Sequence, residues 1–269
     1  MSTLLNFTTR RIRVFKLPEN KPQKPVDTPR NFFIYGDTMS GKSYLANEFP
    51  NPIILNTDGN ATANTVPSIQ LENVKDKNGK ITKSVIEQLA EIMLALRTQE
   101  HTYQTVVVDV IDDVLDLITF ALQDRFEVDS LSEIGYGKGY AMLKSVTREL
   151  IADLKALPMN VIYISRLEEK FDDKGKKIGE APSLPQKQLN QFNGNCDLMI
   201  KTRKIGETYM REVDRKRKNY KPEEIDDPAI LDILMTIRNA FPRGAEKNIK
   251  STKKTVNTKT QAVDDEEDF

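Results

Sequence analysis

The residues best suited to chemistry lie at positions 36 to 43, where the chain reads Gly-Asp-Thr-Met-Ser-Gly-Lys-Ser. This order matches G-x-x-x-x-G-K-[ST], the phosphate-binding P-loop pattern. Its glycines let the backbone wrap around an anion, and the N–H groups that begin the next helix favour negative charge. The pattern predicts that Lys42 contacts the β- and γ-phosphates of a nucleotide and that Ser43 binds Mg²⁺. The predicted nucleotide-binding residues are Gly36, Asp37, Thr38, Met39, Ser40, Gly41, Lys42, Ser43 and Tyr44.

Two aspartates are predicted to complete this chemistry, because each follows a short apolar segment typical of a strand. Asp109 ends the segment TVVVD and is expected to hold Mg²⁺ together with Ser43. Asp58 follows PIILNT, at the edge where parallel sheets collect ligands, so it is a candidate to activate the attacking water. The alternative for Asp58 is an ordinary turn residue within TDGN. Asp112 and Asp113 are expected to cap the helix that follows.

Arg166 is the remaining predicted catalytic residue, beside Lys42, Asp58 and Asp109. With Ser165 it comes at the end of the apolar segment NVIYIS, again at the ligand-bearing edge of a sheet. A polar side chain at this place can sense the γ-phosphate and pass its presence to the segment that follows. The alternative is a solvated arginine at a strand end.

These residues need a scaffold, and the apolar pattern predicts one in which strands and helices alternate. The order indicates an α/β fold with a mainly parallel sheet flanked by helices on both faces. The apolar stripe of the last long helix, from Tyr140 to Leu157, is expected to face the core. The predicted strands are residues 31–35, 52–57, 105–110 and 160–165, and the predicted helices are residues 83–98, 113–126 and 139–157.

Two hairpins are predicted downstream of these elements. Residues 167–184 contain a D-K-G turn between polar arms, typical of an exposed hairpin or a mobile loop. Residues 196–217 form two alternating segments around Ile205-Gly206-Glu207. A final helix, capped at its start, is expected from Asp227.

Three parts of the chain are expected. Residues 1–30 form an N-terminal arm with one strand at 10–17, residues 31–242 form the core, and residues 243–269 form a polar tail that is disordered until bound. The tail ends in an acidic tip followed by Phe269. The acids of the tip are Asp264, Asp265, Glu266, Glu267 and Asp268.

Composition narrows the classes of function. Lys plus Arg equals Asp plus Glu, at 40 each, so average charge does not indicate a nucleic-acid partner. The single cysteine, Cys196, excludes an internal disulfide and is expected to be buried, while the only histidine, His101, is expected in a surface loop. The chain has no apolar run long enough for a membrane and no signal-peptide core, which predicts a cytoplasmic protein without a membrane partner.

The motifs together resemble the RecA-type ATPase core, and more closely the phage-encoded nucleotide-binding proteins of the Sak single-strand annealing group. The resemblance runs from Asn31 to Phe241. It rests on the P-loop, on Asp58, on VVVD ending in Asp109, on YGKGYAMLKSV at 136–146, and on IYISRLEEK followed by basic hairpins. It implies a RecA-like P-loop fold with C-terminal β-hairpins.

The chain differs from this family at three positions. Asp58 stands where glutamate is common, Val110 where serine is frequent, and Arg166 where glutamine or histidine is usual. The shorter side chain of Asp58 implies slower hydrolysis or a different position of the attacking water.

The resemblance further implies that the loop at 170–188 binds single-stranded DNA and that subunits stack into a homo-oligomer. Lys216 or Arg217 would reach the nucleotide of a neighbouring subunit. For base stacking, only Phe171 and Phe192 are at hand. The alternative for the basic runs is a solvated surface. The lysines expected to contact DNA phosphates are Lys170, Lys174, Lys176, Lys177 and Lys187.

The acidic tip is similar to the C-terminal tip of bacterial-type single-stranded DNA-binding proteins. It is expected to compete with DNA or to dock on a partner, and the alternative is a solubilising tail. The function implied is that of a phage ATPase that uses ATP and Mg²⁺ and promotes DNA annealing or recombination. Two alternatives are a P-loop kinase and a nucleotide-gated adaptor or loader that hydrolyses little.

Overall fold

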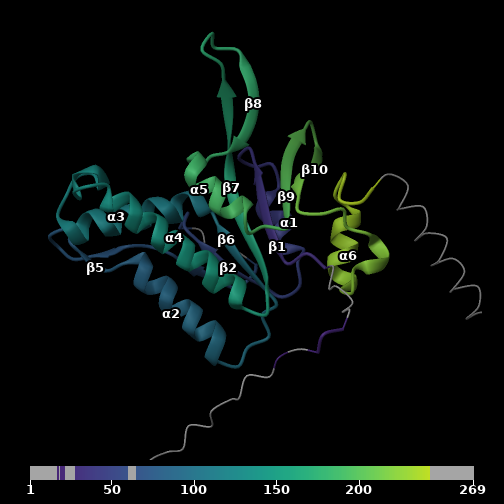
Figure 1. Cartoon of the computed structure of the whole chain (residues 1–269), viewed down its shortest axis with the longest axis horizontal. Helices are drawn as coiled ribbons and strands as arrows, with labels where there is room; N and C mark the ends of the chain where they lie inside the picture. The colour runs from purple at the N-terminus through teal and green to yellow at the C-terminus, as the bar shows by residue number, and fades with distance from the viewer. Residues whose placement is uncertain (1–16, 18, 22–27, 60–64, 243–269) are drawn as a thin grey trace, which may run out of the picture.

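A central sheet organises the computed structural model, which describes residues 17, 19–21, 28–59 and 65–242 (Figure 1). The strand order is β10-β9-β1-β7-β6-β2-β3, and β8 pairs with the outer part of β7. Along this order, every neighbouring pair between β9 and β3 is parallel, whereas the β9–β10 and β7–β8 pairs are antiparallel. The strands are β1 Asn31–Gly36, β2 Pro52–Asn56, β3 Ser68–Gln70, β6 Thr105–Asp109, β7 Asn160–Phe171, β8 Lys177–Pro182, β9 Leu198–Ile205 and β10 Thr208–Lys216.

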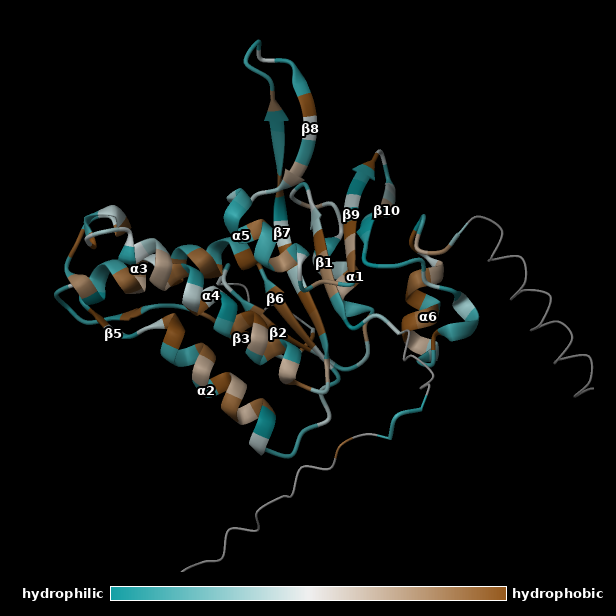
Figure 2. Cartoon of the chain, in the orientation of Figure 1, coloured by the Kyte–Doolittle hydropathy of each residue, from teal (hydrophilic) through white to brown (hydrophobic). Residues whose placement is uncertain are grey.

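Helices cover both faces of the sheet, as the sequence predicts. Phe33 and Tyr35 of β1 enter the core on one face of the sheet, while Phe32 and Ile34 enter the core on the other face. This alternation follows from the two-residue period of a strand. Figure 2 shows apolar central strands and helices with one apolar face. The first face carries α2 Val85–Thr98, α3 Ile111–Phe126, α4 Lys138–Ala156 and α5 Gln186–Asn193, and the second carries α1 Lys42–Asn47 and α6 Pro228–Met235.

Local sequence determines where several helices begin. Ser84 accepts a hydrogen bond from the backbone N–H of Glu87, whose carboxylate in turn accepts from the backbone N–H of Ser84, so α2 begins with a capping box. Asp227 caps α6, as predicted. The prediction that Asp112 and Asp113 cap α3 is wrong, because both lie inside its first turn and bind other groups.

Both predicted hairpins are present. β7 is longer than predicted: its first six residues are buried, and the rest extends beyond the sheet to pair with β8. The β7–β8 hairpin projects from the top of Figure 1, and its tip is hydrophilic in Figure 2. Asp172 Oδ1 accepts from the backbone N–H groups of Lys174 and Lys176, which shapes the turn. The β9–β10 hairpin turns at Gly206, where φ is +58°.

Smaller elements surround this core. A short hairpin joins β4 to β5 next to α3, and the sequence pattern did not predict it. In the parts of the chain that the structure describes, no helix has the length and apolar composition needed to cross a membrane. The strand predicted at 10–17 and the tail from 243 lie outside the described residues, apart from Leu17, which is not in a strand. The smaller elements are β4 Val74–Lys75, β5 Ile81–Lys83 and the 3₁₀ turns Leu131–Glu133 and Pro222–Glu224.

Candidate functional site

The P-loop connects the end of β1 to the start of α1, and two of its positions require glycine, one for lack of space and the other for its backbone conformation. A Cβ on Gly36 would lie 2.3 Å from the carbonyl oxygen of Thr202 on β9. Gly41 has φ +84°, and a Cβ there would lie 3.0 Å from Cδ1 of Tyr209. The glycines of the motif are therefore required by close approach and by backbone conformation. Between them, Ser40 Oγ lies 2.7 Å from Oγ1 of Thr202, which ties the loop to β9.

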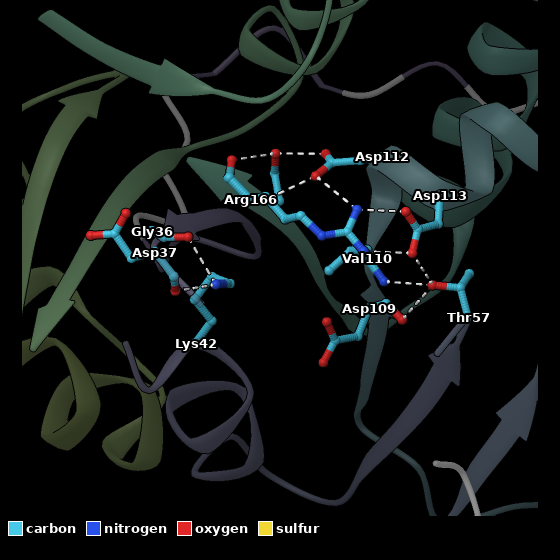
Figure 3. A network of polar contacts seen from close by, with 10 residues as sticks. Gly36, Asp37, Lys42, Thr57, Asp109, Val110, Asp112, Asp113 and Arg166 are labelled. Atoms are coloured by element: carbon cyan, nitrogen blue, oxygen red, sulfur yellow. Dashed lines mark hydrogen bonds and ion pairs between the residues drawn. The ribbon is translucent and has the colours of Figure 1, made fainter. Parts of the chain in front are cut away.

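The Lys42 ammonium lies inside the loop. Its Nζ donates to the backbone oxygens of Gly36, at 2.8 Å, and Asp37, at 2.6 Å. Burial lowers the pKa of Lys42, and the negative charge of Asp109 acts in the opposite direction. An enclosed positive charge beside inward-facing backbone is the arrangement that the motif uses to bind phosphate. Figure 3 shows Lys42 within this loop.

Ser43 and Asp109, the two residues predicted to hold Mg²⁺, are in direct contact. Ser43 Oγ donates to Oδ2 of Asp109 at 2.6 Å. Burial raises the pKa of Asp109, the Ser43 hydrogen bond lowers it, and the charge of Asp58 raises it further. The Ser43 hydroxyl and the Asp109 carboxylate would hold Mg²⁺, whose preferred ligands are oxygens. The described residues contain no cluster of three or more acids, histidines or cysteines suited to a metal.

Arg166 is bound to the start of α3, and we call Arg166, Asp112, Asp113, Ser165 and Thr57 the Arg166 network. Its Nη1 and Nη2 donate to Oδ1 and Oδ2 of Asp113 at 2.5 and 2.8 Å, which is a bidentate ion pair (Figure 3). Its backbone N–H donates to Asp112 Oδ2 at 2.7 Å, and Ser165 Oγ donates to Asp112 Oδ1 at 2.6 Å. The guanidinium is therefore positioned by α3. The alternative that the sequence had left open, a solvated arginine at a strand end, does not describe it.

The carboxylates of this network differ in their titration. Burial raises the pKa of Asp112 to about 6, against the opposing effect of the Ser165 and Arg166 hydrogen bonds. The hydrogen bonds from Arg166 lower the pKa of Asp113. Asp113 therefore stays charged at neutral pH, whereas Asp112 titrates at a pH just below neutral.

Thr57 joins the network to the predicted metal site, and sequence reasoning missed it. Its Oγ1 donates to Asp113 Oδ2 at 3.2 Å and accepts from the backbone N–H of Val110 at 3.2 Å. Its backbone N–H donates to the backbone carbonyl oxygen of Asp109 at 3.0 Å. A usable signal existed, because Thr57 directly follows β2 at the edge where parallel strands gather ligands.

Asp58 lies next to these residues in an exposed turn. Its backbone N–H donates to Asn56 Oδ1 at 3.1 Å, which is turn geometry, and Gly59 follows with φ +75°. Its charge nevertheless acts on Asp109. Asp58 thus stands at the site, and its predicted role in activating water stays a prediction.

The lysines predicted to bind DNA are in unequal surroundings. Lys170 pairs with Glu168 at 2.6 Å, and Lys177 pairs with Glu169 and Glu180. These acids compete with any DNA phosphate for both lysines. The remaining three are exposed and form no ion pair with another described residue: Lys174 and Lys176 at the hairpin tip and Lys187 on α5.

The two predicted base-stacking residues behave differently. Phe171 is 54% exposed, so it is accessible. The prediction for Phe192 is wrong, because this residue is fully buried, with its ring centroid 4.9 Å from that of Tyr163 and 5.8 Å from that of Phe33. Tyr140, expected in the core, is 57% exposed. Phe192 therefore contributes to folding and is not available to a ligand.

The remaining predicted positions lie away from the P-loop. Arg217 donates to the backbone oxygen of Gly194 at 2.9 Å and of Cys196 at 3.3 Å, while Lys216 Nζ lies 3.4 Å from the Asn239 oxygen. A role in a neighbouring subunit stays a prediction for both cations. Cys196 is buried and His101 lies in an exposed loop, as predicted.

Three features define a P-loop nucleoside triphosphatase. A glycine-bracketed loop joins the first strand of the parallel sheet to the first helix, a lysine lies inside this loop, and a serine is hydrogen-bonded to the acid at the end of β6. The family profile described as an AAA domain matches residues 28–226. The chain therefore belongs to this AAA domain family and is a nucleotide-binding ATPase. A search of curated proteins found no match.

Proposed function

We propose that this ATPase uses ATP and Mg²⁺ and binds single-stranded DNA in phage recombination or strand annealing. The observation that carries the proposal is a groove of about 660 Å³ between α4 and α5. Lys144, Arg148 and Lys187 line this α4–α5 groove together with Tyr140. Of the described residues that line it, none is acidic.

The groove residues suit a flexible polyanion. Tyr140, Lys144 and Arg148 follow at intervals of four and share one face of α4. All three are exposed, as is Lys187, and the three cations form no ion pair with any residue that the structure describes. Such cations give salt-sensitive, sequence-independent binding to phosphates, and an exposed tyrosine ring accepts a stacked base.

The groove adjoins the Arg166 network, which supports coupling between DNA binding and hydrolysis. A second pocket, of about 360 Å³, is lined by Arg166 and Asp112 and shares Tyr140 and Gln188 with the groove. From Arg166, direct contacts continue through Asp113 and Thr57 to the backbone of Asp109. We therefore expect DNA to stimulate hydrolysis.

Two assays test the proposal, with steady-state ATP hydrolysis measured with and without single-stranded DNA, and DNA affinity measured over a range of salt. We expect stimulation in the wild type and no hydrolysis in Lys42→Ala. The double variant Lys144→Ala/Arg148→Ala should bind DNA more weakly, with a log–log salt slope smaller by about 1.4, since each phosphate contact to a single strand contributes about 0.7.

A control with the same change of charge separates the groove from general electrostatics. Lys75→Ala/Lys77→Ala removes two exposed lysines from the β4–β5 hairpin, which lines neither pocket. This control should retain DNA affinity and stimulation. Equal weakening in both double variants, or a wild type that binds no DNA, would refute the proposal.

A nucleotide-gated adaptor, or a loader for a replication partner, is the second candidate. It is favoured by the turn geometry of Asp58 and by the ion pair that holds Arg166 on Asp113. ATP binding without turnover would support this candidate. Transfer of phosphate to a nucleoside would instead support a P-loop kinase.

The proposal includes a homo-oligomer in which a cation of one subunit reaches the nucleotide of the next. Arg217 is engaged with two carbonyl oxygens of its own chain, so Lys216 is the better candidate. The acidic tip at 264–269, outside the described residues, is proposed to compete with DNA or to dock on a single-stranded DNA-binding protein. Its deletion should raise DNA affinity at matched salt, and unchanged affinity would remove competition from the proposal.

A further inference from the structure

A pocket of about 590 Å³ opens beside the P-loop on the side of the β9–β10 hairpin. Gly41, Lys42 and Ser43 form one part of its lining, and Tyr44, Tyr209 and Arg211 form another. The volume lies in the range of small-molecule sites. Because the pocket is continuous with the residues expected to bind phosphate, a ligand held there by its phosphates would extend over the two tyrosines.

We infer that Tyr209 and Tyr44 form the subsite for the nucleobase and ribose of the bound nucleotide, with Tyr209 as the main stacking surface. This inference rests on the proposed function of the P-loop in binding ATP. Tyr44 directly follows the sequence motif and is among the predicted nucleotide-binding residues, whereas Tyr209 is not and lies more than 160 residues away along the chain. Tyr209 lies on β10, which pairs with β9, and β9 in turn pairs with β1, the strand that leads into the P-loop. This strand order brings the two tyrosines together.

Both rings are accessible although they stand next to the loop. Tyr209 is 53% exposed and Tyr44 is 68% exposed. Cδ1 of Tyr209 lies 3.0 Å from the place that a Cβ on Gly41 would occupy, so its ring packs on the P-loop backbone. Exposed aromatic rings at the mouth of a pocket offer a large, rigid surface on which a base can stack.

Each ring has a charged neighbour over it. The Arg211 guanidinium lies 5.8 Å from the centre of the Tyr44 ring and is itself bound by Glu48 through two hydrogen bonds, of 2.6 and 2.5 Å. Lys204 Nζ lies 5.3 Å from the centre of the Tyr209 ring. These cation–π contacts favour the observed positions of both rings before a ligand arrives.

The mode of recognition follows from the side chains in the lining. The described residues around this pocket include no amide and no carboxylate side chain that would read the edge of a base. Stacking on a ring depends on the face that every base presents. The subsite therefore holds a base mainly by stacking, and the triphosphate supplies most of the orientation.

Calorimetric titration of the full chain with Mg²⁺ tests the inference, with ATP and inorganic tripolyphosphate as the two probes. Tyr209→Ala should weaken ATP binding about 5- to 150-fold, as expected for the loss of one stacked base, while tripolyphosphate affinity changes less than twofold. Tyr209→Phe should retain ATP affinity, because the ring is kept. Tyr136→Ala, which removes a fully exposed tyrosine outside this pocket, is the matched control and should leave both affinities unchanged.

Other outcomes overturn the inference. Unchanged ATP affinity in both Tyr209→Ala and Tyr44→Ala would exclude a stacking subsite, while the proposed function would stand if Lys42→Ala still abolished binding. Equal loss of ATP and tripolyphosphate in Tyr209→Ala would show that Tyr209 supports the loop and not the base. A wild-type chain that binds neither probe would overturn this inference and the proposed function together.

Discussion

Gly36→Ala is the substitution whose consequence follows most directly from the geometry. The added Cβ would lie 2.3 Å from the Thr202 oxygen, 2.4 Å from Thr202 Oγ1 and 2.7 Å from Ser40 Oγ. The first of these atoms is backbone in a buried parallel pair, so it cannot rotate away. Overpacking of this kind costs about 1–3 kcal/mol, and the close backbone contact places Gly36→Ala at the upper end.

A counteracting effect comes from the unfolded chain. Replacing glycine by alanine stabilises a protein by about 0.4–1 kcal/mol where the native backbone allows it. Gly36 does not have a positive φ, so alanine adds no backbone strain there. The net loss in free energy of unfolding for Gly36→Ala should therefore be about 1–2.5 kcal/mol.

Urea unfolding without added nucleotide measures this loss free of any effect on ligand binding. Gly135→Ala is the control, because Gly135 has no positive φ and no neighbouring atom within 4 Å of the added Cβ. The control should be neutral or stabilised by up to about 1 kcal/mol, so the two variants should change the urea midpoint in opposite directions. A Gly36→Ala variant as stable as Gly135→Ala would refute the packing argument.

Three further predictions concern the core that contains Phe33 and Phe192 and the Arg166 network. Phe192→Ala should lower the free energy of unfolding by about 3–5 kcal/mol in a urea titration, whereas Phe171→Ala should change it by less than about 0.5 kcal/mol. Similar values for the two variants would contradict the burial of Phe192 and the exposure of Phe171. Because the folded pKa of Asp112 is raised from 3.8 to about 6, its protonation should contribute up to about 3 kcal/mol of stability at pH below 4, lost as pH rises through 6. The difference in urea midpoint between wild type and Asp112→Asn, measured from pH 4 to 7, should show this slope, and a flat difference would exclude it. In a double-mutant cycle, Arg166→Gln and Asp113→Asn should couple by about 1 kcal/mol, as fits a bidentate pair that is partly exposed, and additive effects would show that the pair is not formed in solution.

Local patterns explain why much of the fold could be predicted. The P-loop is eight consecutive residues, so its recognition needs no tertiary information, and the strands at 31–35 and 105–110 are short apolar runs between polar turns. The hairpin around Gly206 was likewise predicted from its own turn. Each of these features depends on neighbours in sequence, which a pattern contains.

The rest of the site depends on strand order. Arg166 meets Asp113 because β7 lies beside β6 in the sheet, and Thr57 joins them because β2 lies on the other side of β6. No local pattern in the sequence specifies these neighbours. For the same reason, the packing of Tyr209 on Gly41 required the knowledge that β9 pairs with β1.

Two errors arose from reading single residues without their helical face. In QKQLNQFN, Leu189 and Phe192 are three apart and together form the buried side of α5. The polar composition of this segment concealed that spacing. Tyr140 belongs with Lys144 and Arg148 at intervals of four, on the exposed face of α4, and not with the apolar stripe beside it.

The continuity of β7 has a mechanical consequence. One uninterrupted strand passes from the buried core, past Arg166, to the tip of the projecting hairpin. A strand rises about 3.3 Å per residue, so the segment from Leu167 to Phe171 places the turn roughly 17 Å beyond Arg166. A small rotation of the strand at Arg166, where the ion pair to Asp113 lies, would therefore displace the tip of the hairpin much further than its base.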